Sequence, residues 1–338
     1  MFGSGRLSPL VADGVAAATN ALDAEVEVIG VPVDLDERAV AICIVGDQSS
    51  DPDTRATSGS ATSDSDTSDS DTSDSATSGP DTSDSDTSDS VITEPERLVI
   101  KATRNADEAT RERTALTILA AHLPVPEIRF EDTNDTVSTT GLTFLDGDPV
   151  DHRLAPDRGW TAAASALRTV HGLDPGGLSP TPSHPDHVRD WADTLAAAAL
   201  ELGIIDADVA ERFRVVIELR EQSPPSTMLV HGDASSQHFL QRGGSLTGLL
   251  DLGDAGQGDA AADLAVLTLW APERIESVVD AYCSAGQTDP ATADDLLTRI
   301  AFHRPLRQLA AAIWNEQRGF SPTPFVVALY EELLKPAL

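Results

Sequence analysis

Residues 229–270 read LVHGDASSQHFLQRGGSLTGLLDLGDAGQGDAAADLAVLTLW. Two short apolar runs typical of strands flank a compact loop in this segment, which carries His231, Asp233, His238 and Asp251. The second run ends in Asp251 and so places a carboxylate on a rigid element, where its oxygens suit a hard cation such as magnesium. Asp254 and Asp259 lie in the Gly-rich run that follows, and we interpret them as turn or cap residues. The pattern predicts a polar cleft beside these strands.

The chain around this segment changes character along its length. Residues 160–220 are rich in Ala and Leu at helical spacing, and helices are also expected after residue 270. The first part instead contains strand-like runs at 25–45, 97–104, 124–130 and 139–150, the last of which ends in a Gly/Pro-rich turn. An amphipathic helix is expected between the second and third runs, because Ala115, Leu116, Leu119 and Leu123 are spaced three and four apart. The sequence predicts an α+β chain with a sheet-rich part at 1–140, a hinge near 141–148 and a helical part at 141–338.

Residues 49–90 form a low-complexity insertion built from repeats such as TSDSDTSDSDTSDS. Without large apolar side chains the insertion cannot bury enough surface to offset the entropy of ordering, so we expect it to be disordered. It falls between the strand-like runs 25–45 and 97–104, which suggests an enlarged connection between neighbouring strands. Loop-closure entropy rises only slowly with length, so a surface loop tolerates such growth.

The chain is strongly acidic throughout. Its 56 Asp and Glu against 23 Lys and Arg give a net charge of -33, and outside residues 51–90 the count is still 45 against 22. Lys101 and Lys335 are the only lysines. A carboxylate-rich, lysine-poor surface suits a protein dissolved in molar salt, so we expect a halophile-type cytoplasm. The same field repels phosphate backbones and anionic lipids, so neither nucleic acid nor a membrane is expected as a partner.

Two further observations favour a cytoplasmic location. No run of about 18 apolar residues occurs, and the N-terminal residues lack a basic region followed by an apolar core. Cys43 and Cys283 lie far apart in apolar or helical contexts, so we interpret them as buried thiols and not as a disulfide. The oligomeric state has no signature in the sequence.

The motif pattern resembles the aminoglycoside phosphotransferase family. The resemblance rests on His-Gly-Asp at 231–233, His-Phe-Leu at 238–240, Leu-Leu-Asp at 249–251 and Asp-Leu-Ala at 263–265. The second Asp follows the first by eighteen positions, which is the spacing of the family. The segment ERTALTILAAHLPVPEI at 112–128 also looks like the corresponding segment of the family. The resemblance implies a protein-kinase-like bilobal fold, with a small sheet-rich N-terminal lobe and a larger helical C-terminal lobe.

The resemblance also implies a reaction, the transfer of the γ-phosphate of ATP or GTP to a hydroxyl group of a small molecule. Asp233 would accept or orient the proton of that hydroxyl, while Asp251 and His238 would hold magnesium. The backbone of Thr143, Phe144 and Leu145 at the hinge would contact the adenine. Supporting roles are implied for two further residues: His231 would pack beneath the loop, and Asp263 would hydrogen-bond its backbone.

Lys101 and Glu112 support the same interpretation. A kinase-like site requires a lysine on a strand, to neutralise the α- and β-phosphates, and a glutamate on the next helix, to hold its amine. Lys101 ends an apolar run, and Glu112 follows eleven positions later. Because lysine is almost absent, one retained at a strand end is expected to perform a task that arginine cannot.

Two departures from the family leave alternatives open. His238 stands where most relatives have an Asn that binds a second magnesium, and macrolide-modifying members also have His there. Residues 29–34 occupy the place of the phosphate-covering loop without its usual glycines. One alternative is therefore a kinase fold that binds a nucleotide or a partner without turnover. Another is a metal-dependent hydrolase that uses the His and Asp residues of the loop.

Overall fold

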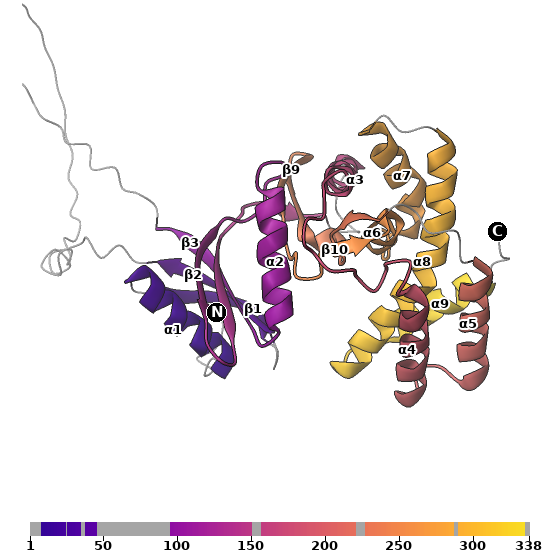
Figure 1. Ribbon diagram of the computed structural model, residues 1–338, viewed down its shortest axis with the longest axis horizontal. Coiled ribbons are helices and arrows are strands. Elements are labelled where there is room, and N and C mark those ends of the chain that lie inside the picture. The colour runs from indigo at the N-terminus through magenta and orange to yellow at the C-terminus, as the bar shows by residue number, and fades with distance from the viewer. Residues whose placement is uncertain are drawn as a thin grey trace, which may run out of the picture.

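The computed structural model of the chain shows two lobes, one built around a sheet and the other mainly from helices (Figure 1). This confirms the expected α+β bilobal fold. The expected disordered insertion at 49–90 lies outside the part of the chain that the structure describes. The described residues are 8–24, 26–34, 38–45, 95–150, 157–220, 227–286 and 290–334.

The first lobe contains an antiparallel sheet with the strand order β1-β2-β3-β5-β4. Its strands are β1 (Val26–Asp34), β2 (Arg38–Val45), β3 (Arg97–Thr103), β4 (Ile128–Thr133) and β5 (Ser138–Thr143). Because β2 pairs with β3, residues 46–94 connect neighbouring strands, as the sequence predicts. The last strand runs past residue 140 to Thr143. The division of the chain at residues 140 and 141 stays a prediction.

Strand β3 has two different faces because its side chains alternate. Leu98, Ile100 and Ala102 are buried against α1 (Pro9–Leu22), a helix that the sequence analysis did not anticipate. Val99 and Lys101 project from the opposite face, where α2 (Ala106–Leu119) lies. Figure 1 shows the two helices on opposite sides of the sheet, with α2 toward the helical lobe. The alternation therefore directs Lys101 toward the space between the lobes.

Helix α2 confirms the amphipathic helix that the sequence predicts. It begins after Asn105, whose side chain accepts hydrogen bonds from the N–H groups of Asp107 and Glu108, both at 3.2 Å. Such a cap satisfies two of the four N–H groups that a helix start leaves free. The apolar side chains of α2 and Glu112 share its buried face, so the helix positions a carboxylate beneath the sheet.

The second lobe combines helices with short strands. β6, β8 and β9 form one small sheet, and β7 pairs with β10 in another. The sequence analysis anticipated β7 and β9 but not β8 or β10. The strands are β6 (Asp148–Pro149), β7 (Met228–Val230), β8 (Phe239–Arg242), β9 (Ser245–Leu249) and β10 (Gly256–Gly258). The helices are α3 (Asp157–His171), α4 (Val188–Glu201), α5 (Ala207–Arg220), α6 (Ala260–Leu267), α7 (Ile275–Ser284), α8 (Pro290–Gln317) and α9 (Thr323–Leu334).

Two apolar cores hold this lobe together. The larger one contains Leu229, Phe239, Leu249 and Leu264, each with 0% exposure, and it also includes residues of α2, α3 and α7. The other joins α4, α5, α8 and α9 at the far end of the lobe (Figure 1). Burying whole side chains around β7, β8 and β9 stabilises the strand-loop-strand segment that carries the candidate site. None of the described helices combines the length and apolar character needed to span a membrane.

Candidate active site

Lys101, Glu112 and Asp251 meet between the two lobes. The Nζ atom of Lys101 lies 2.5 Å from Oε1 of Glu112 and 2.9 Å from Oδ1 of Asp251. The Lys101 and Glu112 side chains are 11% and 7% exposed, so water screens their charges only weakly. The structure therefore brings together a strand-borne ammonium, a helix-borne carboxylate and a carboxylate from the other lobe.

Mutual attraction keeps Lys101 and Asp251 charged. Burial opposes the charged form of Lys101, but Glu112 and Asp251 outweigh it and raise its pKa to about 12. Burial likewise opposes the charged form of Asp251, but Lys101, His238 and Arg38 hold the pKa of this carboxyl well below its usual range. A carboxylate that stays ionised at all ordinary pH values is suited to bind a divalent cation.

Asp251 follows the end of β9 in an unusual backbone conformation. Its φ is +56°, which few residues other than glycine adopt, although Asp tolerates it better than most. Two N–H groups of the Arg38 guanidinium lie 3.4 and 3.5 Å from its oxygens, and the same guanidinium contacts Glu108 at 3.2 Å. Asp251 therefore faces cations from both β2 and β3 of the other lobe.

His238 connects Asp233 to Asp251. Its Nδ1 lies 2.9 Å from the backbone oxygen of Asp233, and its Nε2 lies 3.6 Å from Oδ2 of Asp251. A carbonyl oxygen only accepts, so Nδ1 must carry a proton, which leaves Nε2 with a lone pair in the neutral ring. The second distance is too long for a hydrogen bond. Asp251 and the Nε2 lone pair of His238 thus border the same small region, beside the loop that carries Asp233.

Asp233 belongs to a segment that we call the HGD loop (residues 231–238). The backbone oxygen of Asp233 also accepts a hydrogen bond of 2.8 Å from the N–H of Ser235, and Asp233 is half-buried. A 3-10 turn at Ser236–His238 leads directly into β8. These bonds fix the backbone of the loop around a residue that is partly exposed to solvent.

Asp263 of α6 holds the start of the HGD loop, as the sequence analysis expects. Its carboxylate accepts bonds from the N–H groups of His231 at 2.7 Å and Gly232 at 3.0 Å. His171 contacts the same carboxylate at 3.0 Å, and its other ring nitrogen contacts the Tyr282 hydroxyl at 2.9 Å. Burial disfavours the charged form of Asp263, but the bond with His171 and its other partners lower its pKa. The network is wholly buried, so its role is structural.

His231 and Gly232 also contribute to the shape of the loop. His231 has 0% exposure, and its Nε2 lies 2.9 Å from the backbone oxygen of Leu250, in agreement with the expected packing role. Gly232 has a φ of +85°, and a Cβ added to it would stand 2.0 Å from the backbone oxygen of Asp254. Only glycine fits there. The second position of the His-Gly-Asp motif is therefore required by close backbone packing.

The interpretation of Asp254 and Asp259 as turn and cap residues is confirmed. Asp259 is the N-cap of α6 and accepts a bond of 2.9 Å from the N–H of Ala261, while His303 and Arg299 contact its carboxylate. Asp254 lies in the turn after Asp251. Burial and the nearby carboxylates of the site raise the pKa of Asp254.

The hinge residues lie where β5 leaves the sheet. The N–H of Thr143 donates to the backbone oxygen of Glu127 at 2.9 Å, and the N–H of Phe144 donates to the backbone oxygen of Arg97 at 3.2 Å. The Arg97 guanidinium stacks 4.2 Å from the Phe144 ring. These N–H groups are used inside the protein, so any adenine contact from Phe144 falls to its carbonyl. The expected adenine contacts of Thr143, Phe144 and Leu145 stay a prediction.

Residues 29–34, expected at the phosphate-covering loop, form part of β1. This strand pairs with β2 through two irregular steps, one on each side of Gly30. Residues 35–37, which join the two strands, lie outside the described part of the chain. A paired strand presents fewer free N–H groups than a glycine-rich loop, which agrees with the departure seen in the sequence.

Sequence reasoning missed two cations near the site, Arg38 and Arg307. The Arg307 guanidinium of α8 stacks 5.1 Å from the Trp191 ring, and its Nε has no hydrogen-bond partner among the described residues. Burial lowers the pKa of Arg307 against the attraction of Asp263, Asp233 and Asp254. Neither arginine belongs to a motif, because strand register and helix packing bring them to the site. The sequence offers no local signal for either.

The residues fit a magnesium-nucleotide better than a metal ion held by protein alone. Magnesium is usually bound by one or two carboxylates, with water and phosphate oxygens as its other ligands. The ionised Asp251 carboxylate supplies such a ligand, and the Nε2 of His238 beside it is a poorer partner for a hard cation. The described residues contain no cluster of three or more His, Cys, Asp or Glu side chains that could hold a metal ion.

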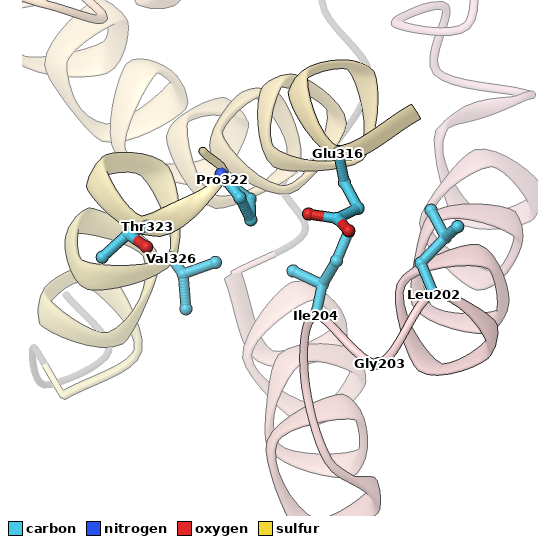
Figure 2. Close-up of a pocket in the computed structure, with 7 residues that line it drawn as sticks. All are labelled: Leu202, Gly203, Ile204, Glu316, Pro322, Thr323 and Val326. Atoms are coloured by element: carbon cyan, nitrogen blue, oxygen red, sulfur yellow. The ribbon is translucent and has the colours of Figure 1, made fainter. Parts of the chain in front are cut away.

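One surface pocket lies far from these residues. Figure 2 shows it between the turn that joins α4 to α5 and the turn that joins α8 to α9. Glu316 is the one charged side chain that lines it. None of the residues discussed above borders this pocket, so it takes no part in the chemistry of the site. Its lining residues are Leu202, Gly203, Ile204, Glu316, Pro322, Thr323 and Val326.

Comparison with sequence families agrees with the geometry. The model of the phosphotransferase enzyme family (APH) matches residues 84–296. An aminoglycoside 3'-phosphotransferase of Escherichia coli is 26% identical over 179 residues, which cover 48% of this chain and 63% of that protein. The chain thus spans somewhat less than two thirds of the length of this curated relative.

Solved structures of similar fold cover nearly the whole chain. One is a thermostable mutant of aminoglycoside phosphotransferase APH(4)-Ia in ternary complex with AMP-PNP and hygromycin B, with a TM-score of 0.60 and 14% identity over 91% of this chain and 92% of that one. Another is macrolide 2'-phosphotransferase MphH of Brachybacterium faecium, with a TM-score of 0.52 and 20% identity over 96% of this chain and 99% of that one. These likenesses confirm the kinase-like bilobal fold.

Proposed function

Because the chain belongs to the phosphotransferase enzyme family (APH), we propose that it transfers the γ-phosphate of ATP or GTP to a hydroxyl group of a small molecule. The observation that carries this proposal is the contact of Lys101 with both Glu112 and Asp251. Such an arrangement matches the requirements of phosphoryl transfer, which needs positioning and charge neutralisation more than covalent chemistry.

The residues that the sequence analysis assigned to the site each have a role in this reaction. Lys101, held by Glu112, binds the α- and β-phosphates of the nucleotide. Asp251 and His238 would hold the magnesium that accompanies the nucleotide. When bound, this magnesium would neutralise phosphate charge. Asp233 accepts or orients the proton of the acceptor hydroxyl, and the fixed backbone of the HGD loop keeps its carboxylate in place. Backbone groups at residues 143–145 contact the adenine.

The acceptor is proposed to be a small hydroxyl compound. The related proteins are named for aminoglycosides, and solved relatives are named for macrolides or hold hygromycin B. All of these compounds carry several hydroxyl groups, and they are the first acceptors to test. Sugars, choline and amino alcohols belong in the same test because the chain shares only 14–26% identity with these proteins.

A screen of nucleotide consumption tests the proposal. The full chain and its Asp233→Ala variant are incubated with ATP or GTP, magnesium and a library of hydroxyl compounds in multimolar potassium chloride. Acceptor-dependent release of ADP or GDP by the full chain, absent from the variant, is the expected result. A phosphorylated acceptor identified by mass spectrometry completes the evidence. Nucleotide consumption by the full chain that does not depend on the acceptor, or that equals the consumption by the variant, contradicts the proposal.

A second candidate is a nucleotide-binding protein without turnover. The placement of residues 29–34 within β1 favours it, because the backbone grip on the phosphates is reduced. This candidate predicts nucleotide binding by calorimetry with no transfer to any acceptor. The hydrolase alternative is less favoured, because hydrolysis by metal-bound water requires neither Lys101 nor Glu112. Phosphoester hydrolysis with zinc or manganese and no nucleotide would support it.

The surroundings in which the protein works are also proposed from its charge. The net charge of -33 and the two lysines suit a cytoplasm rich in potassium chloride. An activity profile over salt concentration tests this: activity and melting temperature that rise toward molar salt are expected. Higher values in dilute buffer would contradict it. Binding assays with duplex DNA and anionic vesicles check the expectation that neither is a partner.

A further inference from the structure

Arg38 has no assigned role in the reaction, yet it lies at the phosphate end of the site. It begins β2, and its Cα lies opposite Thr103 of β3. Thr103 and Lys101 are two residues apart on β3, so all three side chains project from the same face of the sheet. The Arg38 guanidinium contacts Glu108 at 3.2 Å and Asp251 at 3.4 and 3.5 Å.

The contacts of Arg38 leave its hydrogen-bonding capacity partly unused. Charge-assisted bonds between a guanidinium and a carboxylate are usually about 2.7–2.9 Å long, and both contacts with Asp251 are longer. A guanidinium has five N–H donors in total, of which the described carboxylates engage few. Its side chain is 29% exposed, compared with 11% for Lys101. Arg38 can therefore exchange partners more readily than Lys101 can.

The strand next to Arg38 lacks the usual phosphate-binding feature. In kinases a glycine-rich loop between the first two strands covers the phosphates of the nucleotide. Here the residues of β1 before the turn include one glycine, Gly30, and also Pro32, which has no N–H group. Gly30 is paired with Ile42 of β2. The described residues of β1 therefore offer few N–H groups to a phosphate, which favours a contribution from another group.

We propose that Arg38 binds the phosphate groups of the nucleotide directly, in place of a glycine-rich loop. The inference rests on the proposed function, because it assigns a residue to the nucleotide of that reaction. A guanidinium presents parallel N–H groups that match two oxygens of a phosphate, which a single ammonium cannot do. Glu108 keeps the guanidinium at the cleft when Asp251 exchanges it for magnesium. Together, Lys101 and Arg38 bring two positive charges to the phosphates.

A different role for Arg38 is consistent with the same contacts. Arg38 could act only through Asp251, by orienting the carboxylate that binds magnesium. The two roles differ in what they require. Direct binding depends on the number of phosphates and persists without metal, whereas orientation of Asp251 matters only when magnesium is present.

The test measures the affinity of Arg38→Gln for adenosine, ADP and ATP by calorimetry, with magnesium and again with EDTA, at one fixed salt concentration. Arg129→Gln is the matched control, because Arg129 is also an arginine of the same sheet paired with a carboxylate, Glu96, at 3.0 Å. Arg38→Lys keeps the charge without the paired N–H groups. Melting temperatures of all variants show that each is folded.

Direct binding predicts that Arg38→Gln lowers the affinity for ADP and for ATP by at least about tenfold, with and without magnesium. The affinity for adenosine should be unchanged. Arg38→Lys recovers part of the loss, and the control matches the unaltered chain. A loss seen only with magnesium, an equal loss for adenosine, or no loss would overturn the proposal. An unaltered chain that binds no nucleotide overturns it together with the proposed function. Phosphate-dependent binding without transfer to any acceptor refutes the proposed function alone.

Discussion

The Nζ atom of Lys101 lies 2.9 Å from Oδ1 of Asp251, although 150 positions separate the two residues in the chain. Lys101 belongs to β3 of the sheet lobe, and Asp251 follows β9 of the helical lobe. The contact therefore ties the lobes together at the place proposed for the phosphates of the nucleotide. The following expectations depend on this convergence or on the network that supports it.

Asp233→Ala should reduce the rate of phosphate transfer by at least about a hundredfold, because it removes the group that orients or accepts the hydroxyl proton. Affinity for the magnesium-nucleotide should be nearly unchanged, since the proposed role of Asp233 is toward the acceptor hydroxyl. Steady-state kinetics and calorimetry on the same preparation check both statements. Equal losses of transfer and of nucleotide binding, or no loss of either, would reject the assignment of Asp233.

Asp251→Ala should remove the magnesium-dependent part of nucleotide affinity, because the ionised carboxylate is the principal protein ligand proposed for the ion. The affinity measured in EDTA should fall less or not at all. Calorimetric titrations of ATP with and without magnesium give the two values. The same magnesium-dependent gain in the variant and in the unaltered chain would show that another group binds the metal.

Asp263→Asn should destabilise the fold by about 3 kcal/mol near neutral pH, because it removes a buried charge from a network of N–H donors. The pKa of Asp263 in the folded protein lies below its ordinary value of 3.8. Its stabilising contribution is therefore complete above pH 3.8 and is lost as the pH falls through the folded pKa. Denaturant unfolding between pH 7 and pH 3 should show the difference from the unaltered chain shrinking in acid.

The exposed Asp193, paired with Arg214 at 3.1 Å, provides the control for this experiment. Asp193→Asn should change stability by less than about 1 kcal/mol at every pH. A constant penalty for Asp263→Asn across the pH range would contradict the ionised state of Asp263 in the folded protein.

Gly232→Ala should cost at least about 2 kcal/mol and disturb the HGD loop, because the new Cβ would overlap the backbone oxygen of Asp254. Gly243→Ala isolates the effect of backbone conformation. Gly243 also has a positive φ, of +61°, but a Cβ there would meet nothing within 4 Å. Thermal unfolding of the two variants should therefore differ by at least about 1 kcal/mol. Equal costs would mean that the close packing against Asp254 has no energetic importance.

Deletion of residues 51–90 should leave the melting temperature in high salt within a few degrees of that of the full chain. The strands on either side, β2 and β3, are already paired with each other. Shortening the connection between them changes the loop-closure entropy only slightly. A collapse of folding on deletion would show that the insertion contributes to the structure.

Much of the site could be predicted from the sequence because its motifs are local. The spacing of Asp233 and Asp251 and the position of Lys101 at the end of an apolar run are visible without any tertiary information. The position of Glu112 on the following helix, eleven positions after Lys101, is visible in the same way. The structure adds the distances that bring the four residues together, with His238 as the link between the two halves of the motif.

The remaining features depend on packing that a single sequence does not display. Arg38 reaches the site only through the register of β2 on β3, and a shift by one residue would turn its side chain to the other face. Arg307 reaches it through the docking of α8. Strands β8 and β10 are so short that their formation depends more on the strands they pair with than on their own composition. Helix α1 has a local start signal, since Ser8 caps it and Pro9 is its first residue, but its packing on the sheet is a tertiary feature.

The position of the β2–β3 connection has a practical consequence. The N–H of Val45 donates to the backbone oxygen of Glu96 at 3.0 Å, so the described residues that flank the insertion lie side by side. They stand at the edge where Arg97 meets Phe144, whereas Arg38 and Asp251 lie toward the other end of the same strands. A fluorescent reporter or an affinity tag placed in the connection between β2 and β3 would take the position of the natural insertion. It would report on ligand binding from the adenine end of the cleft, away from the place proposed for the phosphates.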